Sequence, residues 1–79
     1  MAQSREYLTR LAFNVSRIRK QRGYTVRELA EIVDVDYSYI SHIENSKANP
    51  SIKLLIKIAD GLEVDFLDLF EGYGEEKRY

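Results

Sequence analysis

The stretch TVRELAEIVDVDYSYISHIEN, residues 25–45, decides the fold because it encodes two short helices joined by a tight turn. Thr25 and Glu28 stand in the S/T-x-x-E relation of a capping box, which predicts that the first helix begins at about Val26. The apolar residues that follow recur at helical spacing and are expected to face a core: Leu29, Ala30, Ile32 and Val33.

The apolar pattern breaks after Val33, at the three residues Asp34, Val35 and Asp36. Asp34 tolerates the left-handed backbone conformation that a tight turn requires. The side chain of Asp36 is expected to cap the N–H groups of a second helix, which runs to about Glu44. The spacing therefore predicts a helix, a turn and a second helix.

The second helix carries few of the Lys and Glu residues that an ordinary solvent face would have. Only Ile40 and Ile43 are strongly apolar, so one narrow side of the helix is expected to face the core. The remaining positions are short or aromatic polar groups, which suit contact with base edges in DNA. They are Tyr37, Ser38, Tyr39, Ser41 and His42.

Individual positions of this stretch match a known motif. Ala30 stands where two helices would cross closely, and Asp34 stands where the turn usually has Gly. Val35, Ile40 and Ile43 stand where the motif needs apolar wedges. The stretch thus resembles the Cro and cI type of helix-turn-helix, which belongs to the xenobiotic-response-element family of small bacterial and phage regulators.

The resemblance extends beyond the motif and covers roughly residues 8–70. LAFNVSRIRKQRG, residues 11–23, is similar to the first helix of the family, and NPSIKLLIKIADGLEVDFLDLF, residues 49–70, to its fourth and fifth. The Tyr-Ile-Ser context of Tyr39 and the later GLEV segment resemble the controller proteins of restriction-modification systems in particular. The resemblance implies an all-α, five-helix, lambda-repressor-like domain.

The length of 79 residues fits one such domain, expected over residues 1–71, followed by a mobile charged tail over residues 72–79. The first helix is expected at about 5–22, ending at Gly23, and the fifth at about 65–71. The first helix should face the core through Leu8, Leu11, Ala12, Val15 and Ile18; the fourth, which starts at Ser51, through Ile52, Leu55, Ile56, Ala59 and Leu62, with Leu54 and Ile58 widening its apolar surface.

The resemblance also implies roles for individual residues. Tyr37, Ser38, Tyr39, Ser41 and His42 are assigned to base contacts; for Tyr39, packing on a sugar-phosphate edge is the alternative. Phosphate contacts are assigned to residues that flank the reading helix, because helix N-termini and short amides commonly bind phosphate. These are Thr25, Arg27, Asn45, Lys47 and Asn49.

Four further positions bear on this comparison. Arg19 and Glu44 occupy positions that the family pairs in a structural salt bridge, which orients the reading helix. Many relatives have Gln at the start of the second helix, where it contacts phosphate and braces the first reading residue, whereas this chain has Val26. Ser46 likewise replaces the usual glycine of the following loop.

Although the net charge is only −1, acidic and basic residues are distributed unevenly along the chain. Residues 51–79 carry more acidic than basic groups, whereas in residues 1–27 Glu6 is the only acidic one. Phosphate binding needs a local positive patch, because more distant charges are largely screened. For any single arginine, the plainer interpretation is a position on a solvated helix face. The basic groups of the first 27 residues are Arg5, Arg10, Arg17, Arg19, Lys20, Arg22 and Arg27.

The fifth helix has a surplus of apolar side chains, which predicts a dimer interface there and at the adjoining end of the fourth helix. One short helix cannot turn all of them into its own small core. The alternative is that one phenylalanine closes the monomer core while the others are scattered surface groups. The residues assigned to the interface are Phe66, Leu67, Leu69 and Phe70.

Composition argues against several other classes of protein. There is no cysteine, no apolar run of membrane-spanning length and no signal-peptide core, so we expect a cytoplasmic protein without disulfides, metal or cofactor. His42 with Ser38 or Ser41 on one exposed helix lacks the pocket that catalysis requires, so an enzyme is not expected.

The expected function is that of a homodimeric transcriptional regulator, a repressor, an activator or both, on a pseudo-palindromic operator. The alternative is a protein-interaction module, since antitoxins and bridging factors share this fold and fold alone does not decide function. Glu28, Glu31 and Asp34 form an acidic surface that touches RNA polymerase in some relatives; a solvated face is the plainer interpretation.

Overall fold

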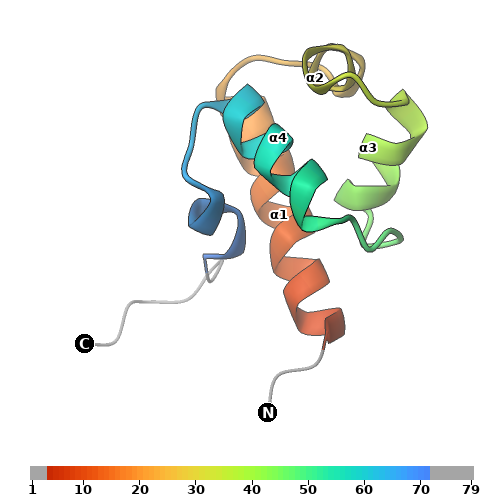
Figure 1. The fold of residues 1–79 in the computed structure, drawn as a ribbon, viewed down its shortest axis with the longest axis vertical. Helices are drawn as coiled ribbons and strands as arrows, with labels where there is room; N and C mark the ends of the chain where they lie inside the picture. The colour runs from red at the N-terminus through yellow and green to blue at the C-terminus, as the bar shows by residue number, and fades with distance from the viewer. Residues whose placement is uncertain (1–3, 72–79) are drawn as a thin grey trace.

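The computed structural model of the chain describes residues 4–71, which form a helical bundle (Figure 1). The elements in chain order are α1 (Ser4–Gln21), α2 (Val26–Val33), α3 (Tyr37–Glu44), α4 (Ile52–Leu62) and the 3₁₀ helix η1 (Phe66–Phe70). The tail expected over residues 72–79 lies outside the described residues. Within residues 4–71, no helix is both long and apolar enough to cross a membrane.

The helix boundaries follow from hydrogen bonds and backbone conformations of residues close together in the sequence. The Thr25 hydroxyl accepts a hydrogen bond from the Glu28 N–H at 3.0 Å, and the Glu28 carboxylate accepts one from the Thr25 N–H at 2.8 Å, so the predicted capping box is present. Asp34 adopts the left-handed conformation, with φ 60° and ψ 50°. Gly23 has φ 81°, which only glycine adopts without strain, and it ends the first helix as expected.

Asp36 corrects one expectation about the turn. It is the N-cap residue of α3, but its side chain makes no capping hydrogen bond to the helix backbone. Its carboxylate instead accepts a hydrogen bond from the Ser38 hydroxyl. A neighbouring hydroxyl thus competes successfully for the carboxylate that the N–H groups would otherwise use.

The fifth element is a 3₁₀ helix of five residues, not the α-helix expected over residues 65–71. The segment is too short to develop i→i+4 bonds, and the Asp68 N–H donates to the Asp65 carbonyl at 3.0 Å. Carbonyls at and just after its end are bound from elsewhere, because the Asn14 side-chain amide donates to the Leu69 oxygen at 3.1 Å and to the Glu71 oxygen at 2.8 Å.

The core lies between α1 and the other elements. From α1, Leu11, Ala12, Val15 and Ile18 are buried as predicted, while Leu8 is half-buried. From the motif, Leu29, Ala30, Val33, Ile40 and Ile43 are buried, but Ile32 is 46% exposed and so does not face the core as expected.

The inward face of α4 is shifted from the one predicted: Leu55, Ala59 and Leu62 are buried as expected, but Ile58 is buried in place of Ile52 and Ile56. Ile58 is completely buried, whereas Ile52 and Ile56 are 61% and 47% exposed. Its apolar stripe was wide enough to fit two orientations, and the one observed buries residues at i, i+3, i+4 and i+7. The buried residues of α4 are Leu55, Ile58, Ala59 and Leu62.

Two polar side chains, Asn14 of α1 and Arg22 just after its end, tie the C-terminal elements to the bundle, a role that the sequence analysis gave to neither of them. Asn14 is 1% exposed and joins the end of η1 through its bonds to the Leu69 and Glu71 carbonyls. Arg22 donates to the Leu62 oxygen at 2.8 Å and to the Glu63 oxygen at 3.1 Å, where α4 ends. Carbonyl groups that are buried or that lie together at a helix end need hydrogen-bond donors of this kind.

Candidate nucleic-acid interface

The helix α3 is held at the edge of the molecule by its two apolar residues. Ile40 and Ile43 are buried at 0% and 1% exposure, and the opposite side of the helix faces outward. Figure 1 shows α3 at one edge of the bundle and η1 at the other. An α-helix that projects in this way has the shape that the major groove of DNA admits.

The residues assigned to base contacts differ in how far they project. Tyr37, Ser38 and His42 are exposed, whereas Ser41 and Tyr39 are half-buried. Tyr39 packs against the core cluster, so its ring lies partly beneath the surface that the others form. The three exposed side chains therefore form the outward face of α3, which we call the reading face.

Asp36, expected from the sequence only as a helix cap, contacts one of the side chains assigned to base contacts. Its carboxylate accepts a hydrogen bond from the Ser38 hydroxyl, so the lone pairs of the Ser38 oxygen are left for other donors. The pairing of Asp and Ser two residues apart at a helix start is a local signal that could have revealed it. The start of α3 is consequently rich in hydrogen-bond acceptors.

The residues assigned to phosphate contacts lie on both sides of α3. Thr25 and Arg27 are exposed at the N-terminus of α2, and Lys47 and Asn49 are exposed in the loop that follows α3. Asn45 is also exposed, but its side-chain amide donates to the Ser41 carbonyl at 2.8 Å and thus supports the end of α3.

Two details of these flanking segments concern positions where the chain departs from its relatives. Val26 is half-buried against the core, and the next residue, Arg27, makes the contact with the reading face: its Cζ atom lies 4.3 Å from the centroid of the Tyr37 ring. Ser46 has φ 61°, a left-handed conformation that explains why glycine is usual at this position.

Arg19 and Glu44 form a bidentate ion pair between α1 and the end of α3. Arg19 Nε and Nη2 donate to the two carboxylate oxygens at 2.7 and 3.0 Å, and Nη1 donates to the Tyr24 carbonyl at 2.8 Å. The side chains are only 11% and 9% exposed. The pair therefore fixes the orientation of α3 relative to α1. Through the Tyr24 carbonyl, Arg19 also holds the segment that leads into α2.

Replacing Glu44 by Ala is expected to lower the free energy of unfolding by about 3 kcal/mol, because the nearly buried Arg19 charge would lose its partner. Urea denaturation measures this. Glu6→Ala is the matched control: it breaks the exposed pair in which Arg10 Nη2 lies 3.2 Å from Glu6 Oε2, and it should cost less than about 1 kcal/mol. Equal losses in both variants would contradict a structural role for the Arg19–Glu44 pair.

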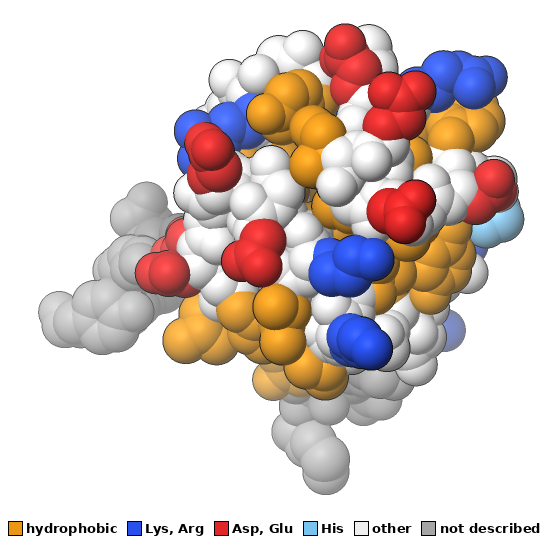
Figure 2. Space-filling model, turned by 45° about the horizontal axis from the view of Figure 1, so that its top comes forward, with side chains coloured by type: hydrophobic (Ala, Val, Ile, Leu, Met, Phe, Trp, Pro, Cys, Tyr) orange, Lys and Arg blue, Asp and Glu red, His pale blue; other side chains and the backbone are white. Residues whose placement is uncertain are grey.

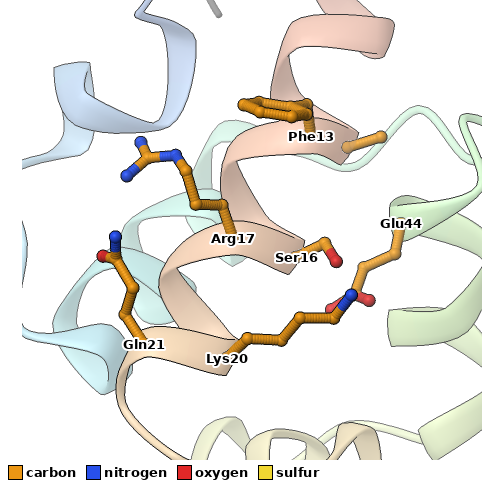
Figure 3. A pocket seen from close by; sticks show the side chains of 7 residues that line it. Phe13, Ser16, Arg17, Lys20, Gln21 and Glu44 are labelled. Atoms are coloured by element: carbon orange, nitrogen blue, oxygen red, sulfur yellow. The ribbon is translucent and has the colours of Figure 1, made fainter.

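An open groove runs along α1 beside the end of α3 (Figure 3). Figure 3 shows the Lys20 side chain extending toward Glu44, while Arg17 lies on the other side of the helix, nearer Gln21. Arg17 Nη2 donates to the Asn14 side-chain oxygen at 3.0 Å. Lys20 thus brings a positive charge from α1 close to the end of the reading helix.

The opposite sign predominates on another side of the molecule. Figure 2, which brings the α2 end forward, shows acidic side chains spread among apolar ones, with fewer Lys and Arg side chains. Glu31 and Asp34 of the acidic surface predicted on α2 are exposed, and the Glu28 carboxylate is engaged in the capping box.

The surface assigned to dimerisation needs one correction. Leu69 is 0% exposed and belongs to the chain's own core, so it is not available to a partner. Leu67, in contrast, is 74% exposed. Phe66 and Phe70 are half-buried, pack against the core and lie 5.5 Å apart between ring centroids.

Comparisons with known proteins agree with this geometry. A family model described as helix-turn-helix matches residues 15–69. The regulator SinR of Bacillus subtilis is 41% identical over 58 residues, which cover 72% of this chain and 52% of that protein. Antitoxin HipB of Escherichia coli is 36% identical over 56 residues, 71% of this chain and 60% of HipB. The chain thus spans only about half the length of SinR.

Solved structures of restriction-modification controller proteins are also similar. The controller protein C.Esp1396I, solved as a tetramer with its natural 35-base-pair operator, superposes with a TM-score of 0.74 at 38% identity, over 81% of this chain and 84% of that one. The controller protein C.AhdI of Aeromonas hydrophila gives a TM-score of 0.78 at 25% identity, over 80% and 96% of the two chains. The chain therefore belongs to the helix-turn-helix family of xenobiotic-response-element type.

Proposed function

We propose that this chain is a sequence-specific duplex-DNA-binding transcriptional regulator, a repressor, an activator or both, that works in the cytoplasm as a homodimer on a pseudo-palindromic operator. The observation that carries the proposal is the polar, outward reading face of α3, held in place by the buried Ile40 and Ile43. The operator complex of C.Esp1396I and the regulator SinR support it, as similar proteins.

In this proposal the reading face enters the major groove of each half-site. Ser38, whose proton is directed to Asp36, accepts a hydrogen bond, and the bases that offer an amino group in this groove are adenine and cytosine. His42, one turn further along, reads a neighbouring base pair. Tyr37, Tyr39 and Ser41 complete the contact, Tyr39 and Ser41 from their half-buried positions.

Phosphate contacts flank these base contacts and fix the register of the protein on the duplex. The N-terminus of α2, with Thr25 and Arg27, meets one strand, and the loop with Asn45, Lys47 and Asn49 meets the backbone beyond the end of α3. Two-fold symmetry then requires half-sites about one helical turn apart, ~10 bp centre to centre or a multiple of it.

Base readers and phosphate contacts should respond differently to mutation. Ser38→Ala or His42→Ala is expected to relax the preference at particular base pairs by about 1 to 3 kcal/mol, because a hydrogen bond to one base edge is lost. Lys47→Ala should weaken binding to all sequences nearly alike. Selection of bound duplexes from a random-sequence pool, followed by affinity measurements on single-base-pair variants, distinguishes the two patterns.

Two outcomes would count against these assignments. A uniform loss of affinity in His42→Ala, with the sequence profile unchanged, would remove His42 from the reading face. Failure of the unmodified protein to enrich any duplex sequence would contradict the proposed function itself.

The homodimer in this proposal is built on the exposed apolar surface around η1. Leu67 projects from η1, and Ile52 and Ile56 project from one side of α4. Ile52 and Phe70 also line one shallow apolar groove, with Tyr7 and Pro50. Residues 1–71 would then supply both DNA binding and dimerisation, with Leu67 and the two phenylalanines of η1 at the interface.

The similarity to antitoxin HipB favours one second candidate, a module whose main partner is another protein. The acidic side formed by Glu31 and Asp34 would suit such a partner, and RNA polymerase is one candidate for it. A gel-shift titration with genomic fragments separates the candidates, because a protein-only module would retard no fragment selectively.

A further inference from the structure

Arg27 and Tyr37 meet at the start of the two motif helices, outside the core. The Arg27 guanidinium carbon lies 4.3 Å from the Tyr37 ring centroid, over the face of the ring. Both side chains are exposed, Tyr37 by 44%. Across residues 4–71, neither side chain has a hydrogen bond or ion pair with another group. Within those residues, the cation–π contact is thus the one electrostatic interaction that holds the two side chains together.

We propose that Arg27 is a specificity-determining residue that positions Tyr37, so that the two side chains read one base pair of each half-site as a unit. This inference rests on the proposed DNA-binding function and adds to it. A plain phosphate contact by Arg27 would carry no sequence preference, because the phosphate is the same at every base pair.

The places of the two residues in the motif support this coupling. Tyr37 is the first residue of α3, and the N-terminal residues of a recognition helix are those that reach base edges. Arg27 lies in the first turn of α2, the helix that crosses the DNA backbone in such motifs. In this arrangement Arg27 lies near the DNA backbone and Tyr37 lies near the base edges.

The chemistry of the contact explains why the pair would act as one. An exposed tyrosine ring with no partner samples several rotamers, and ordering it on binding costs affinity. Arg27 limits this freedom before DNA arrives. Because the guanidinium contacts the face of the ring, the N–H donors that point away from the ring remain available for a phosphate oxygen. Attraction between the two side chains should strengthen when DNA excludes water from them.

A double-mutant cycle tests the proposal. Arg27→Ala and Tyr37→Leu are each expected to lower the preference for the selected base pair by about tenfold, and the double variant should lose no more than either single one. The preference is the ratio of affinities for the duplex selected by the unmodified protein and for its single-base-pair variants. Circular dichroism checks that each exposed replacement leaves the helices intact.

Conservative variants separate ring contact from charge. Arg27→Lys keeps the charge but not the planar guanidinium, so it should lose preference while retaining the salt dependence of the unmodified protein. Tyr37→Phe keeps the ring face and so should keep the coupling with Arg27. In the free protein, the Arg27 Nε–H resonance should show a ring-current shift in NMR spectra that Tyr37→Leu abolishes and Tyr37→Phe retains.

Three results would overturn the proposal. The first is a uniform loss of affinity in Arg27→Ala that adds to the loss in Tyr37→Leu, which would make Arg27 a phosphate contact only. The second is an Arg27 resonance that Tyr37→Leu leaves unchanged. The third is failure of the unmodified protein to select any duplex; this outcome also removes the DNA-binding function, whereas the first two leave that function standing.

Discussion

Affinity for the operator is expected to fall by about three to five powers of ten when salt rises from 50 to 200 mM. Binding of a dimer that neutralises roughly 6 to 10 phosphates releases counterions from the duplex, and added salt opposes this release. Arg27, Lys47 and the basic groups of α1 beside the end of α3 are the side chains placed to make these contacts. A gel-shift titration at several salt concentrations measures the slope.

Lys47→Ala provides the internal control for this measurement. The salt dependence is the slope of the logarithm of affinity against the logarithm of salt concentration. Removing one phosphate contact from each subunit should lower the magnitude of this slope by about 2 per dimer, since each contact contributes about 1 to it. Operator binding that is insensitive to salt, or equal affinity for single-stranded DNA of the same sequence, would contradict insertion of α3 into a duplex.

Leu67→Asp is expected to yield a folded monomer that binds the operator about two to four powers of ten more weakly, because the two half-sites no longer act together. Within residues 4–71, Leu67 is the most exposed of the large apolar side chains, and a buried carboxylate at its place in a symmetric interface would lie close to its own copy. Sedimentation measures the mass, and circular dichroism measures the helix content.

Two further substitutions make the Leu67 result decisive. Ile32→Asp also places a carboxylate at an exposed apolar position, but on α2, so it should leave the dimer intact. Leu69→Asp should unfold the chain, since Leu69 is fully buried in the core. A Leu67→Asp protein that remains dimeric with unchanged helix content would show that the interface lies elsewhere.

Local sequence was enough to predict the motif and its boundaries. The capping box of Thr25 and Glu28, the left-handed Asp34 and the end of α1 at Gly23 all depend on residues within a few positions of one another. The composition of α3, with two buried isoleucines and polar residues elsewhere, likewise predicted which helix would face outward. These features need no knowledge of distant parts of the chain.

Local sequence could not decide which way the C-terminal elements turn. The apolar stripe of α4 allowed Ile52 and Ile56, or Ile58, to face inward, and η1 offered both Leu67 and Leu69. Each choice depends on the surface that the rest of the bundle presents. The structure buries Ile58 and Leu69, which moves the proposed interface onto Leu67 and the neighbouring exposed groups.

The sequence by itself determined the all-helical class, the motif and the polar outer face of α3, because spacing of three or four residues governs caps, turns and amphipathic faces. Only the tertiary structure decided how η1 ends and how Arg27 meets Tyr37. Asn14 binds carbonyls 55 and 57 residues away, and Arg22 binds one 40 residues away. Such contacts depend on how whole helices pack against one another, and no local pattern encodes that packing.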